Sequence, residues 1–340
     1  MTLNISRFAT AFCLTALVLA PVSAQNSSLR GTVEIDGSST VYPISEAAAS
    51  GFNKSYSNVK VNVGVSGTGG GFKRFTKGET DISDASRPIK DSEFAACKEA
   101  GVNFYELPVA YDGLTLVIHK ENDWVDYLTL DEIKKIFTTE GGAKSWSDVR
   151  AGWPKSEIKI FAPGTDSGTF DYFKEVVVGK SETSLRADMS TSEDDNVLVT
   201  GVSGSPNAIG FFGVAYYEEN KDKLKSVAVV NPSTGAKVSP TAETIEDGSY
   251  APFSRPLFIY VNAKSFQRAE IRQFVAYYLT NAPKMAQQTG YVALPATIYR
   301  EGMMRCRSQA KGVGTHYLTE TMEKRGGAVT EVYKSENLVK

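Results

Sequence analysis

Residues 64–71 read Gly-Val-Ser-Gly-Thr-Gly-Gly-Gly and join an alternating apolar run to a Phe-Lys-Arg-Phe segment that suits a helix start. Valine occupies every second position from Val59 to Val65, which is the spacing of a strand. A glycine loop between a strand and a helix directs free backbone N–H groups and the positive end of the helix dipole to one point, where an oxyanion binds well. The hydroxyls of Ser66 and Thr68 add hydrogen-bond donors. For this segment alone, a tight connection without a ligand is the alternative.

The same pattern occurs twice more in the chain. Strand-like residues 33–36 lead into Gly-Ser-Ser-Thr at 37–40, and strand-like residues 158–161 lead into Gly-Thr-Asp-Ser-Gly-Thr at 164–169. A helical pattern follows each loop, with Pro43 near the first helical turn, where its missing N–H is tolerated. Three neutral, hydroxyl-rich helix starts indicate one small tetrahedral oxyanion held from three sides.

Four segments carry a family resemblance: residues 36–43 (Asp-Gly-Ser-Ser-Thr-Val-Tyr-Pro), 66–71 (Ser-Gly-Thr-Gly-Gly-Gly), 81–88 (Asp-Ile-Ser-Asp-Ala-Ser-Arg-Pro) and 163–170 (Pro-Gly-Thr-Asp-Ser-Gly-Thr-Phe). Together they resemble the periplasmic phosphate-binding proteins of the PstS type, the solute receptors of phosphate-specific ABC importers. The segments stand in the family's order, so the resemblance covers essentially the whole mature chain.

The resemblance implies an α/β fold of two lobes, the type II periplasmic-binding-protein fold, with the ligand in the cleft between the lobes. The chain is then expected to cross between lobes twice, at residues 109–113 and near residues 252–256, and to close by a hinge at these crossings. Lobe I would contain residues 25–110 and 255–340, and lobe II residues 111–254.

Local patterns agree with alternating strands and helices. Apolar runs predict separate strands at 102–107 and 114–119, on either side of the first crossing. The capping-box sequence at 129–132 predicts the start of a helix, and an apolar stripe predicts a long helix over 266–279.

Length and charge agree with a two-domain exported protein. The chain has 340 residues, too many for one ordinary core, and a formal net charge of -2 that gives no reason to expect nucleic acid. Residues 1–24 resemble a secretory signal, with an apolar run too short to span a bilayer followed by the cleavage pattern Val-Ser-Ala. The expected location is therefore the periplasm.

Removal of the signal would take away Cys13 and leave Cys97 and Cys306. In an oxidising compartment these two can pair, and two unrelated core residues are the alternative. The two histidines, His119 and His316, show no zinc-ligand spacing, so neither a metal nor a cofactor is expected.

The resemblance assigns phosphate contacts position by position. The first loop supplies Ser39, Thr40 and the backbone of Val41, the second supplies Thr68 and Gly69, and the third supplies Ser167, Gly168 and Thr169. Helix capping is the alternative role for the same hydroxyls.

The site cation departs from the family pattern. Its best-known members carry an arginine four residues before the Ser-Gly-Thr serine, where this chain has Pro163, and an aspartate where this chain aligns Arg87. We therefore expect Arg87 to be the only fixed cation of the site, giving two parallel donors to the anion. A surface arginine beside a turn proline is the alternative.

A carboxylate is also expected, because phosphate keeps a proton at physiological pH whereas sulfate does not. An acceptor for that proton would reject sulfate by placing two acceptors face to face. The candidates are Asp84, Asp112 and Asp166, each of which can equally serve a turn or a cap.

The function predicted from these features is high-affinity binding of inorganic phosphate by a periplasmic monomer, with delivery to the membrane permease subunits of an ABC importer. A receptor for another tetrahedral oxyanion, such as sulfate or molybdate, is the first alternative. A secreted phosphatase with Ser167 or Thr169 as nucleophile is the second, but neither histidine lies in a loop with these hydroxyls, and such a nucleophile needs a base or a metal. We therefore expect no enzymatic activity.

Overall fold

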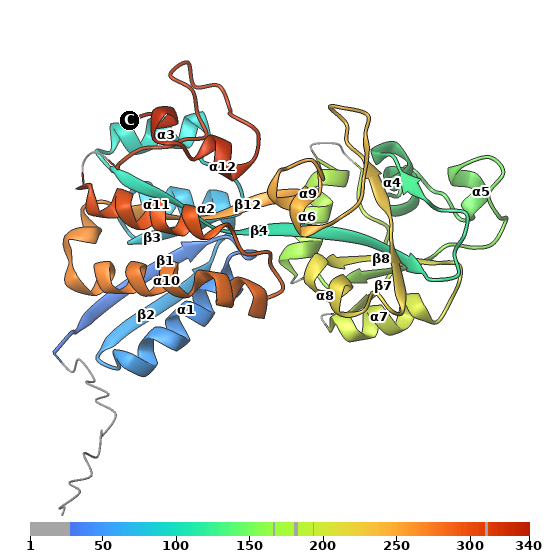
Figure 1. The fold of residues 1–340 in the computed structure, drawn as a ribbon, viewed down its shortest axis with the longest axis horizontal. Coiled ribbons are helices and arrows are strands. Elements are labelled where there is room, and N and C mark those ends of the chain that lie inside the picture. The colour runs from blue at the N-terminus through green and yellow to red at the C-terminus, as the bar shows by residue number, and fades with distance from the viewer. Residues whose placement is uncertain (1–27, 166, 180–182, 193, 310–311) are drawn as a thin grey trace, which may run out of the picture.

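The computed structural model describes residues 28–165, 167–179, 183–192, 194–309 and 312–340. The predicted signal peptide and Asp166 lie outside the described residues. Two α/β lobes stand side by side and are joined by the long strands β4 (Phe104–His119) and β12 (Ser254–Asn262) (Figure 1). The two-lobe α/β fold expected from the sequence is therefore confirmed.

Lobe I is built on a sheet with the strand order β2-β1-β3-β12-β4. Strands β1, β2 and β3 run parallel, whereas β12 is antiparallel to both of its neighbours. The further elements of lobe I are β1 (Gly31–Gly37), α1 (Tyr42–Ser55), β2 (Val59–Val65), α2 (Gly67–Thr76), β3 (Ile82–Ala85), α3 (Asp91–Glu99), α10 (Ala269–Gln288), α11 (Ala296–Arg307) and α12 (Val329–Val332).

Lobe II continues the ladder from the second half of β4 in the order β4-β8-β6-β7, with β9 also paired to β4, and adds a small sheet of β11-β10-β5. Its elements are β5 (Tyr127–Leu128), α4 (Leu130–Phe137), α5 (Trp146–Val149), β6 (Lys159–Pro163), α6 (Gly168–Val177), β7 (Ser190–Ser192), α7 (Asp195–Ser203), β8 (Ala208–Gly213), α8 (Val214–Glu219), β9 (Leu224–Ser226), β10 (Ala228–Val230), β11 (Lys237–Val238) and α9 (Ala242–Glu246).

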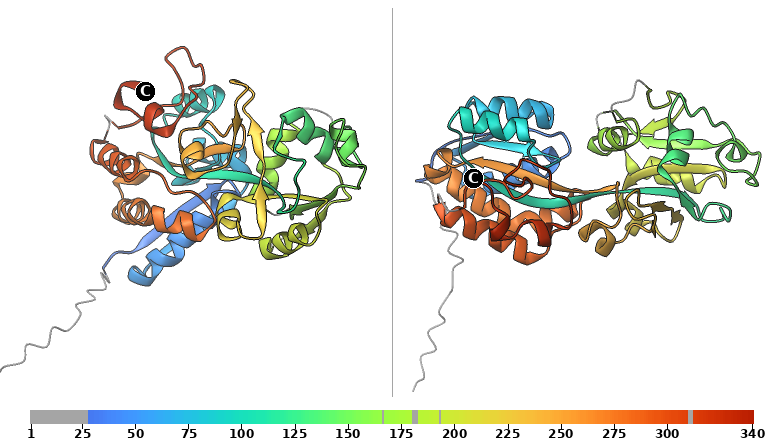
Figure 2. Two further views of the ribbon diagram at one scale, coloured as in Figure 1. Left: turned by 45° about the vertical axis from the view of Figure 1, so that its right-hand side comes forward. Right: turned by 90° about the horizontal axis from the view of Figure 1, so that it is seen from above.

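Strand β4 corrects one prediction. The sequence pattern predicted two strands, at 102–107 and 114–119, but the structure has one strand that runs through both lobes. The connecting residues stay extended because β12 pairs with them across the crossing, with Asp112 opposite Arg255 and Gly113 opposite Ser254. Both predicted crossings therefore lie at paired strands, and Figure 2 shows the narrow connection that these strands form.

The predicted capping box is confirmed, and the long C-terminal helix extends further than predicted. The capping box is present: the Thr129 hydroxyl accepts from the Glu132 N–H at 3.2 Å, and the Glu132 carboxylate accepts from the Thr129 N–H at 2.9 Å. Helix α10 extends nine residues beyond the predicted end at residue 279. Ala282, Met285 and Ala286 continue its buried face, so packing carries the helix past Pro283.

Apolar side chains fill separate layers on the two faces of the lobe I sheet. One layer includes side chains of α1, α10 and α11, and the other includes side chains of α2 and α3. Cys306 belongs to the first layer and Cys97 to the second, and both thiols are buried and free. The disulfide considered from the sequence is therefore wrong, because the sheet separates the two residues and each packs as a small apolar side chain. Burial raises the pKa of each thiol to about 12.

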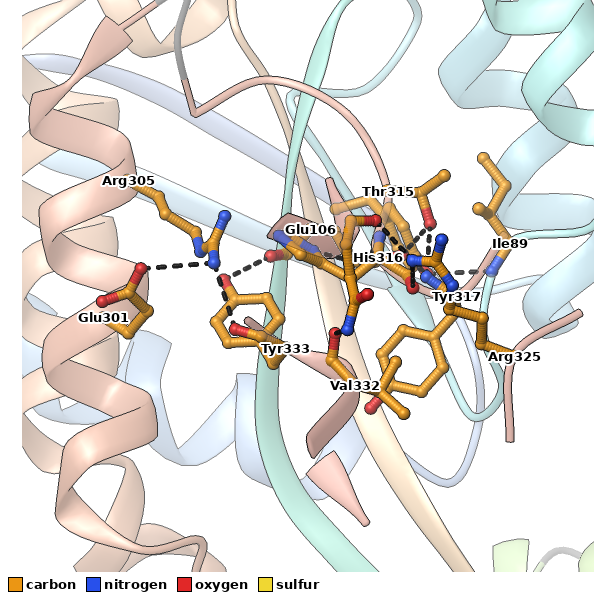
Figure 3. Close-up of polar contacts among 12 residues, drawn as sticks. Ile89, Glu106, Glu301, Arg305, Thr315, His316, Tyr317, Arg325, Val332 and Tyr333 are labelled. Carbon is orange, nitrogen blue, oxygen red and sulfur yellow. Dashed lines mark hydrogen bonds and ion pairs between the residues drawn. The ribbon is translucent and has the colours of Figure 1, made fainter. Parts of the chain in front are cut away.

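The C-terminal segment, residues 312–340, is fastened to lobe I by Glu106 of β4 (Figure 3). This buried carboxylate accepts from the Thr315 hydroxyl at 2.7 Å, from the His316 N–H at 2.7 Å and from the Tyr260 hydroxyl at 2.9 Å. The ring of His316 also lies against it, with Nδ1 3.1 Å from the carboxylate. Burial lowers the pKa of His316, so the ring is neutral near pH 7. Glu106 therefore holds the segment mainly through hydrogen bonds.

None of the helices in the described ranges combines the length and the apolar character needed to cross a bilayer.

Replacement of the anchoring carboxylate should be costly. Glu106→Ala is expected to lower the free energy of unfolding by on the order of 3 kcal/mol or more, because several buried donors lose their acceptor. Glu106→Gln, which keeps one acceptor oxygen, should fall between this variant and wild type. Urea unfolding measures the effect. Glu331→Ala, which removes an exposed carboxylate of the same segment, should change stability by less than about 0.5 kcal/mol, and equal losses in both alanine variants would contradict the assignment.

Candidate functional site

The carboxyl ends of β1, β2 and β3 meet at one edge of the lobe I sheet, next to lobe II. Helix α1 follows β1 after residues 38–41, as the first hydroxyl loop predicted. Helix α2 begins already at Gly67, so residues 67–71, predicted as a loop before a helix start at Phe72, instead form the first turns of the helix. The loops pack closely: a Cβ atom on Gly71 would lie 2.6 Å from the Cα atom of Gly37, so a side chain there would force them apart. Ligands of open α/β sheets bind at this edge.

Hydrogen bonds fix the first two loops to each other. Asp36, at the end of β1, accepts from the Ser66 hydroxyl at 2.8 Å and from Nη1 of Arg74 at 2.7 Å. The backbone N–H of Ser66 donates to the carbonyl oxygen of Gly37 at 3.1 Å. The Ser66 hydroxyl therefore orients the loop instead of facing a ligand.

The second loop is also joined to the turn after β3. The Thr68 hydroxyl lies 3.1 Å from the Ser86 hydroxyl and accepts from the Ser86 N–H at 3.2 Å. This places Thr68 beside Arg87, the next residue of the turn. The loops that follow β1, β2 and β3 thus form one connected surface.

Helix α6 of lobe II faces this surface. Ser167 is its N-cap, and its hydroxyl accepts from the Thr169 N–H at 3.2 Å, which is the capping role considered as the alternative. Gly168 touches the first loop: a Cβ atom there would lie 2.6 Å from the Cα atom of Thr40. Ser39 donates to Oδ2 of Asp171 at 3.4 Å, so contacts between the lobes already exist here.

A cavity of about 210 Å³ lies between these loops and α6. For scale, one water molecule occupies about 30 Å³ of liquid. The cavity is lined by Ser38, Ser39, Thr40, Gly67, Thr68, Gly69, Ser86, Arg87, Asp171, Tyr172, Glu175 and Arg255. Its surface is mainly polar, as an anion site between two lobes requires.

The structure thus brings five of the predicted contact residues to one cavity: Ser39, Thr40, Thr68, Gly69 and Arg87. Val41 is fully buried behind the first loop. Residues 167–169 flank the cavity without lining it. Helix α6 instead contributes Asp171, Tyr172 and Glu175 to the lining.

Arg255 is a cavity residue that the sequence did not single out. Its Nε lies 3.3 Å from Oδ2 of Asp112, its Nη1 lies 3.1 Å from Oε2 of Glu175, and its Nη2 donates to the Thr40 hydroxyl at 3.3 Å. The guanidinium also stacks on the ring of Tyr172, 3.6 Å from the centroid. One guanidinium therefore contacts both lobes and the strand that joins them. The available signal was an arginine next to a predicted crossing.

Arg87 reaches the cavity, but it is not the lone cation that the sequence predicted. Its guanidinium forms two parallel hydrogen bonds to the Glu93 carboxylate, both at 2.8 Å, and Nη1 also donates to the carbonyl oxygen of Pro88 at 3.1 Å. With Arg255 nearby, the cavity has two guanidinium groups, and each is held by a carboxylate.

Two of the three predicted proton acceptors, Asp84 and Asp112, do not line the cavity. Asp84 of β3 is fully buried and points to the layer of α1 and α10. Neither of its carboxyl oxygens makes a hydrogen bond within the described residues. Burial raises its pKa to about 8, an effect that nearby Ser45 opposes and the charge of Asp36 reinforces. Asp112 lies behind Arg255, where burial raises its pKa and Arg255 opposes the rise. Asp166 lies outside the described residues.

Two α/β lobes joined by crossing strands, with a small polar cavity between them at the strand ends, define a bilobal solute-binding protein. The family model of the PBP superfamily domain matches residues 22–282. "Protein SphX" of Synechococcus elongatus is 46% identical over 334 residues, which cover 95% of this chain and 97% of that one. The phosphate-binding protein PstS of Staphylococcus saprophyticus is 43% identical over 280 residues, which cover 82% and 85%. Among solved structures, a "possible phosphate binding protein" from Planctomyces limnophilus superposes with a TM-score of 0.80, at 42% identity, and covers 83% of this chain and 100% of its own.

The chain belongs to the PBP superfamily and, within it, to the PstS-type phosphate-binding proteins.

Asp84→Asn should change how stability depends on pH. The raised pKa means that the folded protein keeps a proton which the unfolded chain releases near the ordinary value of 3.8, so wild-type stability should fall as pH rises from there to about 8. The neutral amide carries no such penalty. The variant is therefore expected to gain on wild type through this range, by on the order of a few kcal/mol at pH 8 and above. Urea unfolding from about pH 5 to about pH 9 measures the difference.

The exposed variant Asp123→Asn serves as a control and should follow the wild-type curve. If Asp84→Asn also ran parallel to wild type over the whole range, the carboxylate would be ionised in the folded protein and the pKa assignment would be wrong.

Proposed function

We propose that this protein binds inorganic phosphate in the cavity between its lobes and delivers it to a membrane permease of the ABC type. The observation that carries the proposal is the lining of that cavity, where hydroxyls from three loops of lobe I and two oriented guanidinium groups face one small space. The phosphate-binding names of two similar proteins support the same ligand. Those relatives are binding proteins, which agrees with a role that involves no catalysis.

The donors suit a strongly hydrated anion. Removal of phosphate from water must be matched by protein hydrogen bonds, and charge-assisted bonds contribute roughly 1.5–3 kcal/mol each. A micromolar ligand needs about 8 kcal/mol in total. A set drawn from Ser39, Thr40, Thr68 and the two arginines offers more than this in gross hydrogen-bond free energy, part of which desolvation and lobe closure consume. Because Arg87 and Arg255 are already held in place by carboxylates, little side-chain entropy is lost on binding.

The arginines do not supply their full charge to the anion, because Glu93, Asp112 and Glu175 neutralise part of it. In our proposal the ligand takes over the donor that Arg255 now gives to Thr40, and the Thr40 hydroxyl turns to the ligand. Selectivity then depends on matched hydrogen bonds more than on net charge.

We propose that the carboxylate of Asp171 in α6 accepts the hydrogen bond that the protonated oxygen of phosphate donates. This carboxylate lines the cavity and accepts from Ser39, whereas Asp84 and Asp112 do not reach the cavity. An ionised carboxylate at this position accepts the proton of phosphate and repels sulfate, which has none to give.

The setting proposed for this activity is the periplasm, after removal of residues 1–24. The protein would act there as a monomer with lobe I at residues 25–110 and 255–340 and lobe II at 111–254. Closure would occur about the paired strands β4 and β12, and the closed form would present both lobes to the permease subunits.

Substitution of the cavity arginines should weaken ligand binding, and urea unfolding checks that each variant stays folded, because Arg255→Ala also leaves the buried Asp112 without its cation. Arg255→Ala and Arg87→Ala are each expected to weaken phosphate binding some 30-fold or more, because loss of a charged partner in a desolvated site typically costs ~2 to 5 kcal/mol. Titration calorimetry of the mature protein measures the affinity. Lys73→Ala removes an exposed cation of α2 outside the cavity lining and should leave binding unchanged. Binding of the Arg255→Ala variant within about threefold of wild type would rule out the assigned role of this arginine.

Asp171→Asn should alter selectivity more than affinity for phosphate. The amide can donate to either anion, so the preference for phosphate over sulfate is expected to fall by about tenfold or more. Competition of sulfate against labelled phosphate gives the ratio. Glu218→Gln, an exposed change on α8, is the matched control. A variant that rejects sulfate as well as wild type does would show that another group accepts the proton.

A further inference from the structure

A second cavity of about 400 Å³ adjoins the first. The residues common to both linings are Ser86, Arg87, Tyr172, Glu175 and Arg255. The two spaces therefore meet at the two arginines, and a ligand bound in the first cavity has open volume on one side. We call the second cavity the vestibule.

The outer wall of the vestibule comes from the C-terminal segment. The lining includes Tyr317 and residues 324–327. The loop between them is closed at its base, where the Arg325 N–H donates to the carbonyl oxygen of Tyr317 at 2.8 Å. The PBP superfamily model ends at residue 282, so this wall lies outside the matched region.

This wall is held in place on both sides of the hinge. In lobe I, Glu106 accepts from the backbone and side chains of residues 315–316 (Figure 3). On the other side, the Val329 N–H donates to the Tyr111 hydroxyl at 3.1 Å, and that hydroxyl donates to the carbonyl oxygen of Glu246 at 2.8 Å. The vestibule is therefore a built space with a fixed wall.

The wall adds positive charge that no carboxylate neutralises within the described ranges. Lys324 is exposed and forms no ion pair there. The guanidinium of Arg325 donates to the carbonyl oxygen of Asn337 at 2.7 Å and forms no ion pair there either. By contrast, both arginines of the first cavity have carboxylate partners.

One buried hydroxyl in the lining also lacks a partner. The side chain of Tyr317 is 2% exposed, and its hydroxyl makes no hydrogen bond within the described residues. An unsatisfied buried hydroxyl is unfavourable, and a ligand oxygen that reached it from the vestibule would supply the missing acceptor. The rest of the lining includes Pro88, Pro252 and Pro256, which offer no N–H donors.

We propose that the vestibule is a second anion subsite and that the protein also binds condensed phosphates, of which inorganic pyrophosphate is the smallest. One phosphoryl group would occupy the first cavity. The second would lie in the vestibule, between the arginines and the cationic wall, with the Tyr317 hydroxyl as a donor. Lys324 determines this specificity without contributing to the binding of a single phosphate. The inference rests on the proposed phosphate function of the first cavity.

Titration calorimetry of the mature protein with inorganic phosphate, pyrophosphate and phenyl phosphate tests this subsite. Wild type should bind phosphate and pyrophosphate. Lys324→Ala should weaken pyrophosphate binding by about tenfold and leave phosphate affinity within twofold, because the side chain reaches only the second phosphoryl group. Tyr317→Phe should show the same pattern without any loss of stability, because it removes a hydroxyl that has no partner within the described residues. Lys334→Ala, in the same segment but outside the vestibule lining, should affect neither ligand.

The other outcomes are distinct from one another. If phosphate binds and pyrophosphate does not, the second subsite is absent while the proposed function stands. If neither binds, the proposed function itself fails. If Lys324→Ala lowered the affinities for phosphate and pyrophosphate equally, Lys324 would act through long-range electrostatics, and the second subsite would be ruled out. Binding of phenyl phosphate as tight as that of pyrophosphate, and insensitive to Lys324→Ala, would show that the vestibule takes an apolar substituent and would overturn the proposal.

Discussion

The pairing of Arg255 with Asp112 organises the centre of this molecule. Both residues lie in the strands that join the lobes, directly opposite each other in the β12–β4 ladder, and the aspartate is buried. Arg255 supplies the positive charge beside this carboxylate, and its guanidinium extends to Thr40 in lobe I and Glu175 in lobe II. The same interaction therefore pairs the buried carboxylate of one crossing strand with the arginine of the other, and it holds the guanidinium at the cavity.

The cavity combines two kinds of donor for a physical reason. Backbone loops and hydroxyls are neutral, so they can be assembled at the strand ends without electrostatic cost before a ligand arrives. Guanidinium groups supply strength but repel each other, and here each is compensated by its own carboxylate, Glu93 for Arg87 and Asp112 for Arg255. In the proposed function, a site built this way would carry little uncompensated charge when it is empty, which suits a receptor that must release its ligand.

The sequence predicted what is local and missed what depends on pairing. The helix starts after the first and third hydroxyl loops and the capping box at Thr129 are short-range signals, and they appear where expected. Helix α2 starts at Gly67, inside the predicted glycine loop. The role of Arg255 depends on a strand register that joins residues 143 apart in the chain. Asp84 was a reasonable candidate by loop position, but the alternation of side chains along β3 directs it away from the cavity. The cysteine pairing is wrong for a similar reason, because the spacing of two cysteines in the sequence does not show whether they lie on the same face of a sheet.

Tyr111 connects the C-terminal segment to lobe II across the strands that join the lobes. Its single hydroxyl links the C-terminal segment, through Val329, to α9 of lobe II, through Glu246. In the proposed lobe closure, rotation of lobe II would lengthen or break one of these two hydrogen bonds. Each bond contributes only about 0.5–1.5 kcal/mol, close to thermal energy, so these bonds would slow the proposed rotation without preventing it. In the proposed closure, the end of the chain would therefore resist rotation weakly, although it lies far in sequence from the loops that line the first cavity.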